Sequence, residues 1–211
     1  MAWEFHHGLD TVVVIDPHRS KAFVKDFLGD WRPQSWLSGR LGSQRGWAQR
    51  GHQVCLAHLI HDVQYAEDAG DRVLAPGMKG LLKRACTLGR RRDRLADSTL
   101  KVYEADLEKR LDRLLALRPV ALAGQKMQRV IKRSRLHLFV FMAARPTNNG
   151  LERARRPCAV YRKITNSFRS EWGARLYADI RSVVETARRR SLRAIDAIRL
   201  TLARSPFPAE T

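Results

Sequence analysis

The sequence predicts an α/β protein whose sheet domain is interrupted by a helical insertion. Two observations carry this prediction. Short apolar runs suited to strands stand in the first third of the chain, and longer segments with apolar residues at helical spacing follow them. The chain has 211 residues, of which 44% are hydrophobic and 29% charged. This composition is typical of a folded globular protein with a sizeable core.

Three short apolar runs predict the strands. The β-branched run Thr11–Ile15 is followed by an Asp-Pro pair that ends it. Trp36–Ser38 leads into a glycine-rich loop over residues 39–51, and Val54–Leu56 leads directly into a helix. We therefore expect a small mixed sheet in this part of the chain.

The first helices are predicted from caps and apolar spacing. Ser20 is expected to cap a short helix that ends at Gly29. Residues 71–80 contain proline and two glycines and are expected to form a connection. Two antiparallel helices should follow, with apolar residues at helical spacing over 95–115 and 127–141.

The C-terminal part is predicted to be helical. A turn cluster at residues 146–150 should begin a short helix that Pro157 ends. Residues 171–190 predict an amphipathic helix, and Ser191 is expected to cap the last one. The side chains expected to point inward from the amphipathic helix are Trp172, Leu176, Ile180, Val183, Val184 and Ala187.

These elements suggest a domain division. Residues 1–69 are expected to form the first part of the sheet domain, and residues 70–145 a helical insertion. Residues 146–203 should return to the sheet domain, and 204–211 should form a tail.

The charge of the chain is unevenly distributed. The formal net charge is +19. Residues 1–76 hold 8 basic and 9 acidic side chains, whereas residues 77–211 hold 32 and 12, a net charge of +20. Of the 40 basic residues 31 are Arg, which binds phosphate through two hydrogen bonds at once. Nucleic acid is the partner that this pattern favours. The alternative is that the charges only coat solvated helices.

Cysteine content and hydropathy bear on the compartment. Cys55, Cys86 and Cys158 are odd in number and widely spaced, which argues against a disulfide framework. The N-terminus lacks the pattern of a secretory signal, and no apolar run approaches the roughly 20 residues that cross a bilayer. We therefore expect a cytoplasmic protein without a membrane partner.

Cys55 and His58, followed by His61 and Asp62, place a thiol, imidazoles and a carboxylate at a strand-to-helix junction. As a zinc site the pattern is weak, because no second Cys or His pair stands at a ligand spacing. On spacing alone, a buried cysteine and a hydrogen-bonded histidine are favoured.

Glu152 is the second candidate. Between residues 126 and 169 it is the one acid among 12 basic side chains. With Asn149 three residues before it, it resembles a capping box. Glu152 is equally compatible with a carboxylate that holds a divalent metal beside phosphate-binding arginines. The periodicity of the sequence does not favour either interpretation.

Two blocks of sequence resemble a known family. Residues 51–66, GHQVCLAHLIHDVQYA, resemble the central block of the IS66-type insertion-sequence transposases. Residues 146–157, PTNNGLERARRP, resemble that family's last catalytic block, and the likeness continues through residues 161–174. The resemblance extends from about Thr11 to Ala203.

The resemblance implies an RNase H-like fold with an Asp-Asp-Glu triad and a helical insertion ahead of the glutamate. It implies DNA binding, strand cleavage and strand transfer with two Mg²⁺ ions. Glu152 matches the triad glutamate and would be a metal ligand. Cys55 and His58 match a Cys-x-x-His element that follows the second aspartate, and Asn148 and Asn149 match a polar turn. The residues expected to contact DNA are Asn148, Asn149, Arg153, Arg155, Arg156, Arg162, Lys163 and Arg169.

The chain also departs from the family. Gly39 stands where the second aspartate belongs, directly after the run Trp36–Ser38. The first aspartate precedes the Trp3 region in the family, and we expect an N-terminally truncated copy that lacks it. Asp10 and Asp16 flank the first predicted strand, but neither fills a matching position.

The sequence therefore predicts an incomplete RNase H-like mixed sheet in a transposase-derived, nucleoid-associated protein. Catalysis is expected to be lost, and Mg²⁺ is not expected to be held stably. The alternatives are a regulatory fragment that binds DNA and inhibits an intact transposase, and a decaying reading frame. Besides DNA, the expected partners are a second copy or the intact enzyme.

Overall fold

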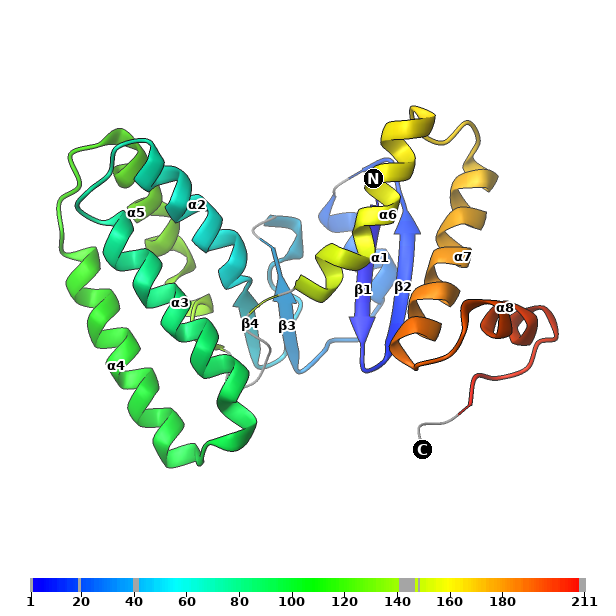
Figure 1. Ribbon diagram of the computed structural model, residues 1–211, viewed down its shortest axis with the longest axis horizontal. Helices are drawn as coiled ribbons and strands as arrows, with labels where there is room; N and C mark the ends of the chain where they lie inside the picture. Colours follow the sequence, from blue (N-terminus) through cyan, green and yellow to red (C-terminus); the bar gives the residue numbers. More distant parts are fainter. Residues whose placement is uncertain (1, 19, 40–41, 141–146, 148, 209–211) are drawn as a thin grey trace. The chain divides into compact units, whose positions relative to one another are not determined.

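A computed structural model describes residues 1–211 apart from 1, 19, 40–41, 141–146, 148 and 209–211 (Figure 1). The described residues form many helices and two small sheets of two strands each, so the predicted mixture of helix and strand is confirmed. The chain divides into two compact units. The first, which we call the hairpin unit, consists of residues 1–23 and 149–211, and the second, the helical unit, consists of residues 24–148.

The hairpin unit begins with two antiparallel strands, β1 (Ala2–His7) and β2 (Asp10–Ile15). The strands are joined by a two-residue turn in which Gly8 has a φ of 56°, a conformation that glycine adopts without strain. β2 was predicted from its β-branched residues. β1 was not, because its aromatic and histidine residues give no clear strand pattern.

α1 (Lys21–Leu28) follows, and its caps confirm the prediction. The Ser20 hydroxyl accepts a hydrogen bond of 3.1 Å from the backbone N–H of Phe23. Gly29 ends the helix with a φ of 55°.

α1 crosses the boundary between the two units, whereas three helices lie wholly in the hairpin unit: α6 (Asn149–Thr165), α7 (Glu171–Arg189) and α8 (Ala194–Leu202). The prediction that Pro157 ends a short helix is wrong, because α6 continues through it. The next residue, Cys158, is buried against Val13 and Ala178, so packing outweighs the proline's effect on the helix.

The predicted cap of the last helix is also wrong. α8 is preceded by Arg193, and Ser191 has a φ of 56° in the turn after α7. The chain reverses at Ser191 through a left-handed residue, and the helix therefore begins later than the serine suggests.

The inward face of α7 matches the predicted one at Ala187, which is buried, but differs from it near the start of the helix. Trp172, Leu176 and Ile180 are 71%, 49% and 46% exposed, whereas Ala174 and Ala178 are buried. α7 approaches the hairpin through small residues and hydroxyl groups, so its large apolar side chains are left on the opposite side.

The helical unit contains two parallel strands, β3 (Ser35–Ser38) and β4 (Gly51–Val54), which were both predicted near these positions. The loop between them contains one 3₁₀ turn, η1 (Gly42–Gln44). β4 ends where the third strand was expected to begin. The apolar residues after Val54 cap and enter the next helix instead.

Four long helices complete this unit: α2 (Leu56–Asp68), α3 (Ala75–Arg91), α4 (Asp97–Leu115) and α5 (Leu122–Ser134), with 3₁₀ turns η2 (Arg92–Arg94) and η3 (Arg135–His137). The expectation that residues 71–80 form a connection is wrong, since α3 begins inside them. Pro76 lies in the first turn of α3, where a proline is tolerated. The buried Asp71 carboxylate accepts hydrogen bonds from the backbone N–H groups of Leu74 and Ala75 at 3.3 and 2.9 Å.

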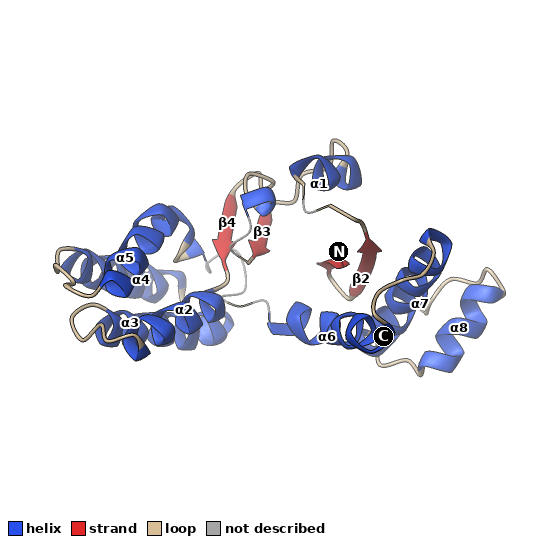
Figure 2. Ribbon diagram, turned by 90° about the horizontal axis from the view of Figure 1, so that it is seen from above, coloured by secondary structure: helices blue, strands red, loops and turns tan. Residues whose placement is uncertain are grey.

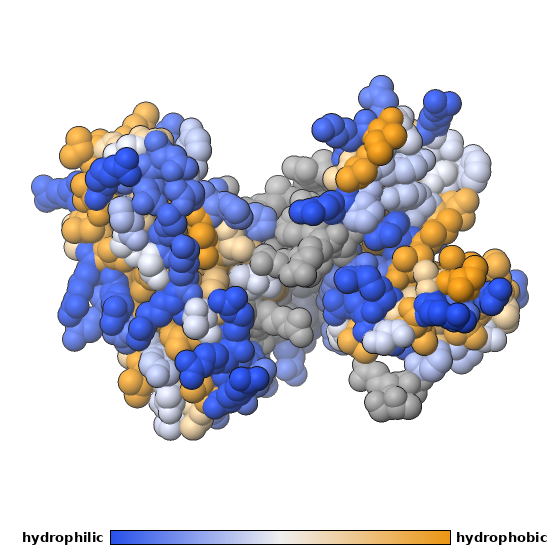
Figure 3. Space-filling view, viewed as in Figure 1, coloured by the Kyte–Doolittle hydropathy of each residue, from blue (hydrophilic) through white to orange (hydrophobic). Residues whose placement is uncertain are grey.

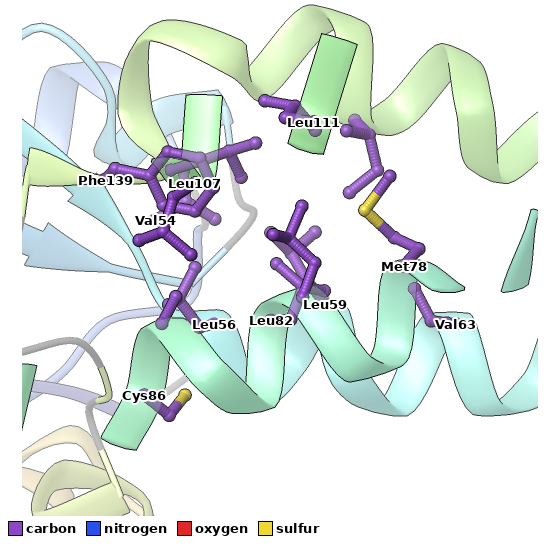
Figure 4. Close-up of a cluster of buried hydrophobic side chains, with 14 of the residues drawn as sticks. Val54, Leu56, Leu59, Val63, Met78, Leu82, Cys86, Leu107, Leu111 and Phe139 are labelled. Atoms are coloured by element: carbon purple, nitrogen blue, oxygen red, sulfur yellow. The ribbon is translucent and has the colours of Figure 1, made fainter. Parts of the chain in front are cut away.

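The core of the helical unit joins β4 to α2, α3, α4 and α5 (Figures 2 and 4). Leu56 and Leu59 of α2 and Leu82 of α3 are fully buried in it, together with Leu107 and Leu111 of α4. This core fixes the carboxyl end of β4 and the start of α2. None of the described helices is long and apolar enough to cross a membrane.

Candidate active-site and DNA-binding residues

The carboxyl ends of β3 and β4 lie at one edge of the parallel pair. Gly39 follows β3 and Cys55 follows β4, and the Cys55 N–H donates a hydrogen bond of 2.8 Å to the Ser38 carbonyl oxygen. Cys55 is also the N-cap residue of α2, so His58 lies in the first turn of that helix. The sheet and the helix start thus place residues 39 and 58 at the same edge.

Gly39 and His58 are brought together. A Cβ atom at position 39 would lie 3.8 Å from Cε1 and 3.9 Å from Nε2 of His58, and 3.7 Å from Oε1 of Gln44. These are ordinary van der Waals distances, so a side chain at position 39 meets no clash. There is therefore room for the first atom of a larger side chain at position 39, where this chain has glycine.

Gln44 is a neighbour of position 39 that the sequence did not single out. It belongs to the 3₁₀ turn η1 in the glycine-rich loop. A single glutamine in such a loop has no recognisable motif, and only the folded loop brings it beside Gly39.

Two buried polar side chains support the end of β3. The Ser38 hydroxyl is hydrogen-bonded to Nε2 of His52 at 2.8 Å, and the His52 ring lies 4.9 Å from that of His137. Burial, with the nearby His137 and Arg45 charges, lowers the pKa of His52 from 6.5 to about 4. The His52 ring is therefore neutral near pH 7. Its hydrogen bond to Ser38 joins β4 to β3 at the residue before Gly39.

The atoms nearest to position 39 include no carboxylate. Mg²⁺ prefers carboxylate and other oxygen ligands in octahedral geometry, and of the atoms that a Cβ at position 39 would meet only the Gln44 amide oxygen is of this kind. Within the described residues, no three His, Cys, Asp or Glu side chains are grouped so that they could hold a metal ion. All three cysteines are buried, and none forms a disulfide.

The second candidate region begins with α6 in the hairpin unit. Glu152 lies in the first turn of this helix, which begins at Asn149. Asn148 lies outside the described residues, as do the side chains of Asn149, Glu152, Arg153 and Arg155. Gly39 and His58 belong to the helical unit, and each unit is described by itself.

The later part of α6 exposes basic side chains. Arg156, Arg162 and Lys163 are exposed, and so is Arg169 in the turn before α7. Apolar side chains on the same helix are exposed as well. Figure 3 shows hydrophobic and hydrophilic residues side by side at this end of α6. This surface offers exposed cationic groups to a polyanion.

The sequence model described as the transposase IS66 family matches residues 6–176. The chain belongs to this family. No curated protein and no solved structure matches it. The matched range includes the sheet edge with Gly39 and His58 as well as the first turn of α6 with Glu152. DNA is the partner that IS66 membership implies, and a divalent metal is the usual cofactor of such transposases.

Proposed function

We propose that this IS66-family chain binds DNA and does not itself cut or join DNA strands. The proposal rests mainly on the glycine at position 39. It lies at the end of β3 beside His58, where the family resemblance places the second aspartate of the triad, and it has no side chain to hold a metal.

The loss of one carboxylate at this edge is expected to be decisive. In a two-metal mechanism one ion activates the attacking oxygen and the other stabilises the leaving oxygen, and both are held by acids from separate elements. Glu152 supplies one acid. Arg153, Arg155 and Arg156 follow it within four residues of the sequence, and guanidinium groups so near in sequence are expected to compete with a metal for this carboxylate. Mg²⁺ keeps its waters and binds poorly to a single carboxylate.

DNA binding is supported by charge and exposure. Residues 77–211 carry the whole excess of positive charge, and the described basic side chains of α6 are exposed. Phosphate contacts of this kind are insensitive to base sequence and weaken as salt rises. Binding is therefore expected to be weak, general and strongly dependent on salt.

A regulatory role is the second candidate, and the same pair of observations favours it. A chain with the family's basic surface and a glycine at position 39 would occupy DNA without cutting it. It would then inhibit an intact transposase by competing for transposon ends, or by joining its assembly.

One end-labelled DNA duplex tests binding and cleavage together. The chain is added with Mg²⁺ at several salt concentrations, and the label is followed by anisotropy and on a denaturing gel. We expect a salt-dependent rise in anisotropy with no shortening of the strand. Absence of binding at low salt, a flat response to salt, or cleavage would contradict the proposal.

A further inference from the structure

One helix of the helical unit carries positive charge alone. α5 (Figure 1) contains four basic side chains and neither Asp nor Glu. The preceding helix, α4, contains four basic and five acidic side chains, so its own charges nearly balance. The basic side chains of α5 are all exposed, and they are Lys126, Arg129, Lys132 and Arg133.

Three of these cations share one line along α5. With about 100° between successive residues, Lys126, Arg129 and Arg133 project within about 60° of one another, and we call them the cationic stripe. From the first to the last of them the helix rises about 10.5 Å, which is the axial rise of about three phosphates on one DNA strand. The stripe is therefore long enough to neutralise about three phosphates of a duplex.

The polar side chains of α5 divide into two groups. The glutamines fasten the helix to the end of α4 and the connection that follows. Nε2 of Gln128 donates to the carbonyl oxygens of Leu115 and Leu117 at 3.1 and 2.7 Å, and Nε2 of Gln125 donates to that of Pro119 at 3.3 Å. The four cations are not used in this way, since none has a hydrogen-bond or ion-pair partner among the residues that the structure describes.

The other contacts of this region also leave the stripe unpaired. Arg135, directly after α5, lies 3.1 Å from Oε2 of Glu108 and 2.5 Å from Oδ1 of Asp112, so these two acids of α4 already have a partner. Met127 and Ile131 on the opposite side of α5 are buried in the core of the helical unit. The helix is therefore held firmly while its cations stay exposed.

The charge of the chain does not supply a polyanion for the stripe. The helical unit contains 24 basic and 12 acidic side chains, and the hairpin unit contains 16 and 9. Both units are thus net positive, by +12 and +7. An external polyanion is the partner that an exposed, unpaired row of cations fits.

We propose that the cationic stripe of α5 contacts the phosphates of duplex DNA, as a second and smaller surface besides the basic residues of α6. This inference rests on the DNA binding proposed above and adds to it a contact made by the helical unit. Each cation neutralises one phosphate without reading a base, so the contact is insensitive to sequence and weakens as salt rises. Because α5 is already fixed in place, binding costs little backbone ordering.

An anionic membrane surface is the other polyanion that basic helices bind. Such helices insert a broad apolar face beside their cations. In α5 this face contains Met127 and Ile131 and is buried in the core. Leu122 at the start of the helix is 61% exposed, but one leucine does not replace that face. Duplex DNA, which requires no apolar face, is therefore favoured.

Charge removal from two helices of the full chain tests the contact. One variant changes the stripe by Lys126→Gln, Arg129→Gln and Arg133→Gln. The control removes three exposed charges from α4 by Lys101→Gln, Lys109→Gln and Arg113→Gln. Anisotropy titrations of a labelled duplex should give a salt slope that is smaller by about 2.7 for the stripe variant and by less than about 0.9 for the control. Circular dichroism checks that both variants fold.

The outcomes separate this inference from the proposed function. Salt-dependent binding by the unmodified chain, with equal slopes for the two variants, would overturn the α5 contact alone. Absence of duplex binding by the unmodified chain at low salt would overturn both. If the stripe variant lost binding to anionic phospholipid vesicles but bound duplex like the control, the stripe would be a membrane contact and the proposal would be wrong.

Photocrosslinking gives a readout that total charge does not change. A benzophenone attached to Leu122→Cys lies on the line of the stripe and removes no cation. Val102→Cys on α4 is the matched control, since Val102 is 67% exposed. The three native cysteines are buried and should not be labelled. We expect at least tenfold more crosslinked duplex from the label at position 122. Equal yields from the two positions, or none from either, would contradict the proposal.

Discussion

The helical unit and the hairpin unit differ in how they are held together. In the helical unit, β4 and four helices share a continuous apolar core built from large side chains such as Leu56, Leu82 and Leu107. In the hairpin unit, the described apolar contacts are divided between a cluster of Val13, Cys158 and Ala178 and the aromatic rings of Trp3, Phe5 and Phe23. Much of the attachment of α7 to β2 is made instead by hydroxyl groups.

The two units are therefore expected to govern different properties of the protein. Position 39 and His58 stand on the helical unit, whose core fixes the sheet edge that they share. The basic residues of α6 stand on the hairpin unit. We expect mutations to affect stability mainly through the helical unit and DNA binding mainly through the hairpin unit.

Truncation of a core leucine should have the largest effect on stability. Leu107→Ala in α4 should lower the free energy of unfolding by roughly 2–5 kcal/mol, because a fully buried side chain is replaced by a cavity. Val13→Ala in the hairpin unit should lower it by roughly 1–2 kcal/mol. Urea unfolding measures both values. Val102→Ala, at a position that is 67% exposed on α4, is the control and should change stability by less than about 0.5 kcal/mol. A larger loss for Val13→Ala than for Leu107→Ala would reverse the comparison.

Acid should destabilise the helical unit through His52. Its pKa is about 4 when folded and 6.5 in the unfolded chain, so the unfolded state binds more protons between these values. Stability should therefore fall as pH drops from about 6.5 to 4, by no more than about 3 kcal/mol. Unfolding curves across this range measure the loss. His52→Gln should flatten the dependence, and the exposed His61→Gln should not. An unchanged slope in His52→Gln would contradict this assignment.

A substitution at the contact between Gly124 of α5 and Asp71, which caps α3, should have an intermediate effect on stability. A Cβ atom at Gly124 would lie 2.5 Å from Cγ of Asp71, so Gly124→Ala forces the capping carboxylate to move. We expect a loss of roughly 1–3 kcal/mol. Asp71→Ala removes the cap and should cost about as much. A double-mutant cycle measures the coupling, and the loss for Gly124→Ala should shrink when Asp71 is absent. Additive losses would show that the two residues are independent.

Replacing a single basic residue should have the smallest effect, and it should change DNA binding without changing stability. Arg162→Ala and Lys163→Ala should each reduce the salt slope of duplex binding by about 0.9 if each neutralises one phosphate. Arg193→Ala is the matched control, because Arg193 is already paired with Asp196 at 2.6 Å. Anisotropy titrations at several salt concentrations give the slopes. Equal slopes for all three variants would show that α6 does not contact the phosphates.

The sequence predicted elements where local signals and packing agree. Thr11–Ile15 is β-branched and forms β2, and the Ser20 cap and Gly29 stop delimit α1. The signals failed where tertiary contacts override them. Pro157 lies inside α6, and the large apolar residues of α7 point outward because Ser182 and Thr186 dock on β2.

The candidate site was predictable only in part. The family resemblance singled out Gly39 and His58, but their proximity comes from the parallel pairing of β3 and β4, which was not predicted. Gln44 and the Ser38–His52 pair could not, because they depend on how one glycine-rich loop folds and on which polar groups become buried. The roles of Glu152 and its neighbouring arginines stay predictions, as does the division at residues 69, 145 and 203.

Nicking of supercoiled DNA tests most directly whether this chain lacks catalysis. The unmodified chain, Glu152→Gln and Gly39→Asp are incubated with Mg²⁺ or Mn²⁺ under conditions in which all three bind the plasmid. We expect no nicking above background by any of them. A Cβ atom at position 39 meets no clash, but one added carboxylate does not by itself make a two-metal site, which needs acids from several elements. Nicking by the unmodified chain that disappears in Glu152→Gln would contradict the account, because it would show that a working metal site exists without an acid at position 39.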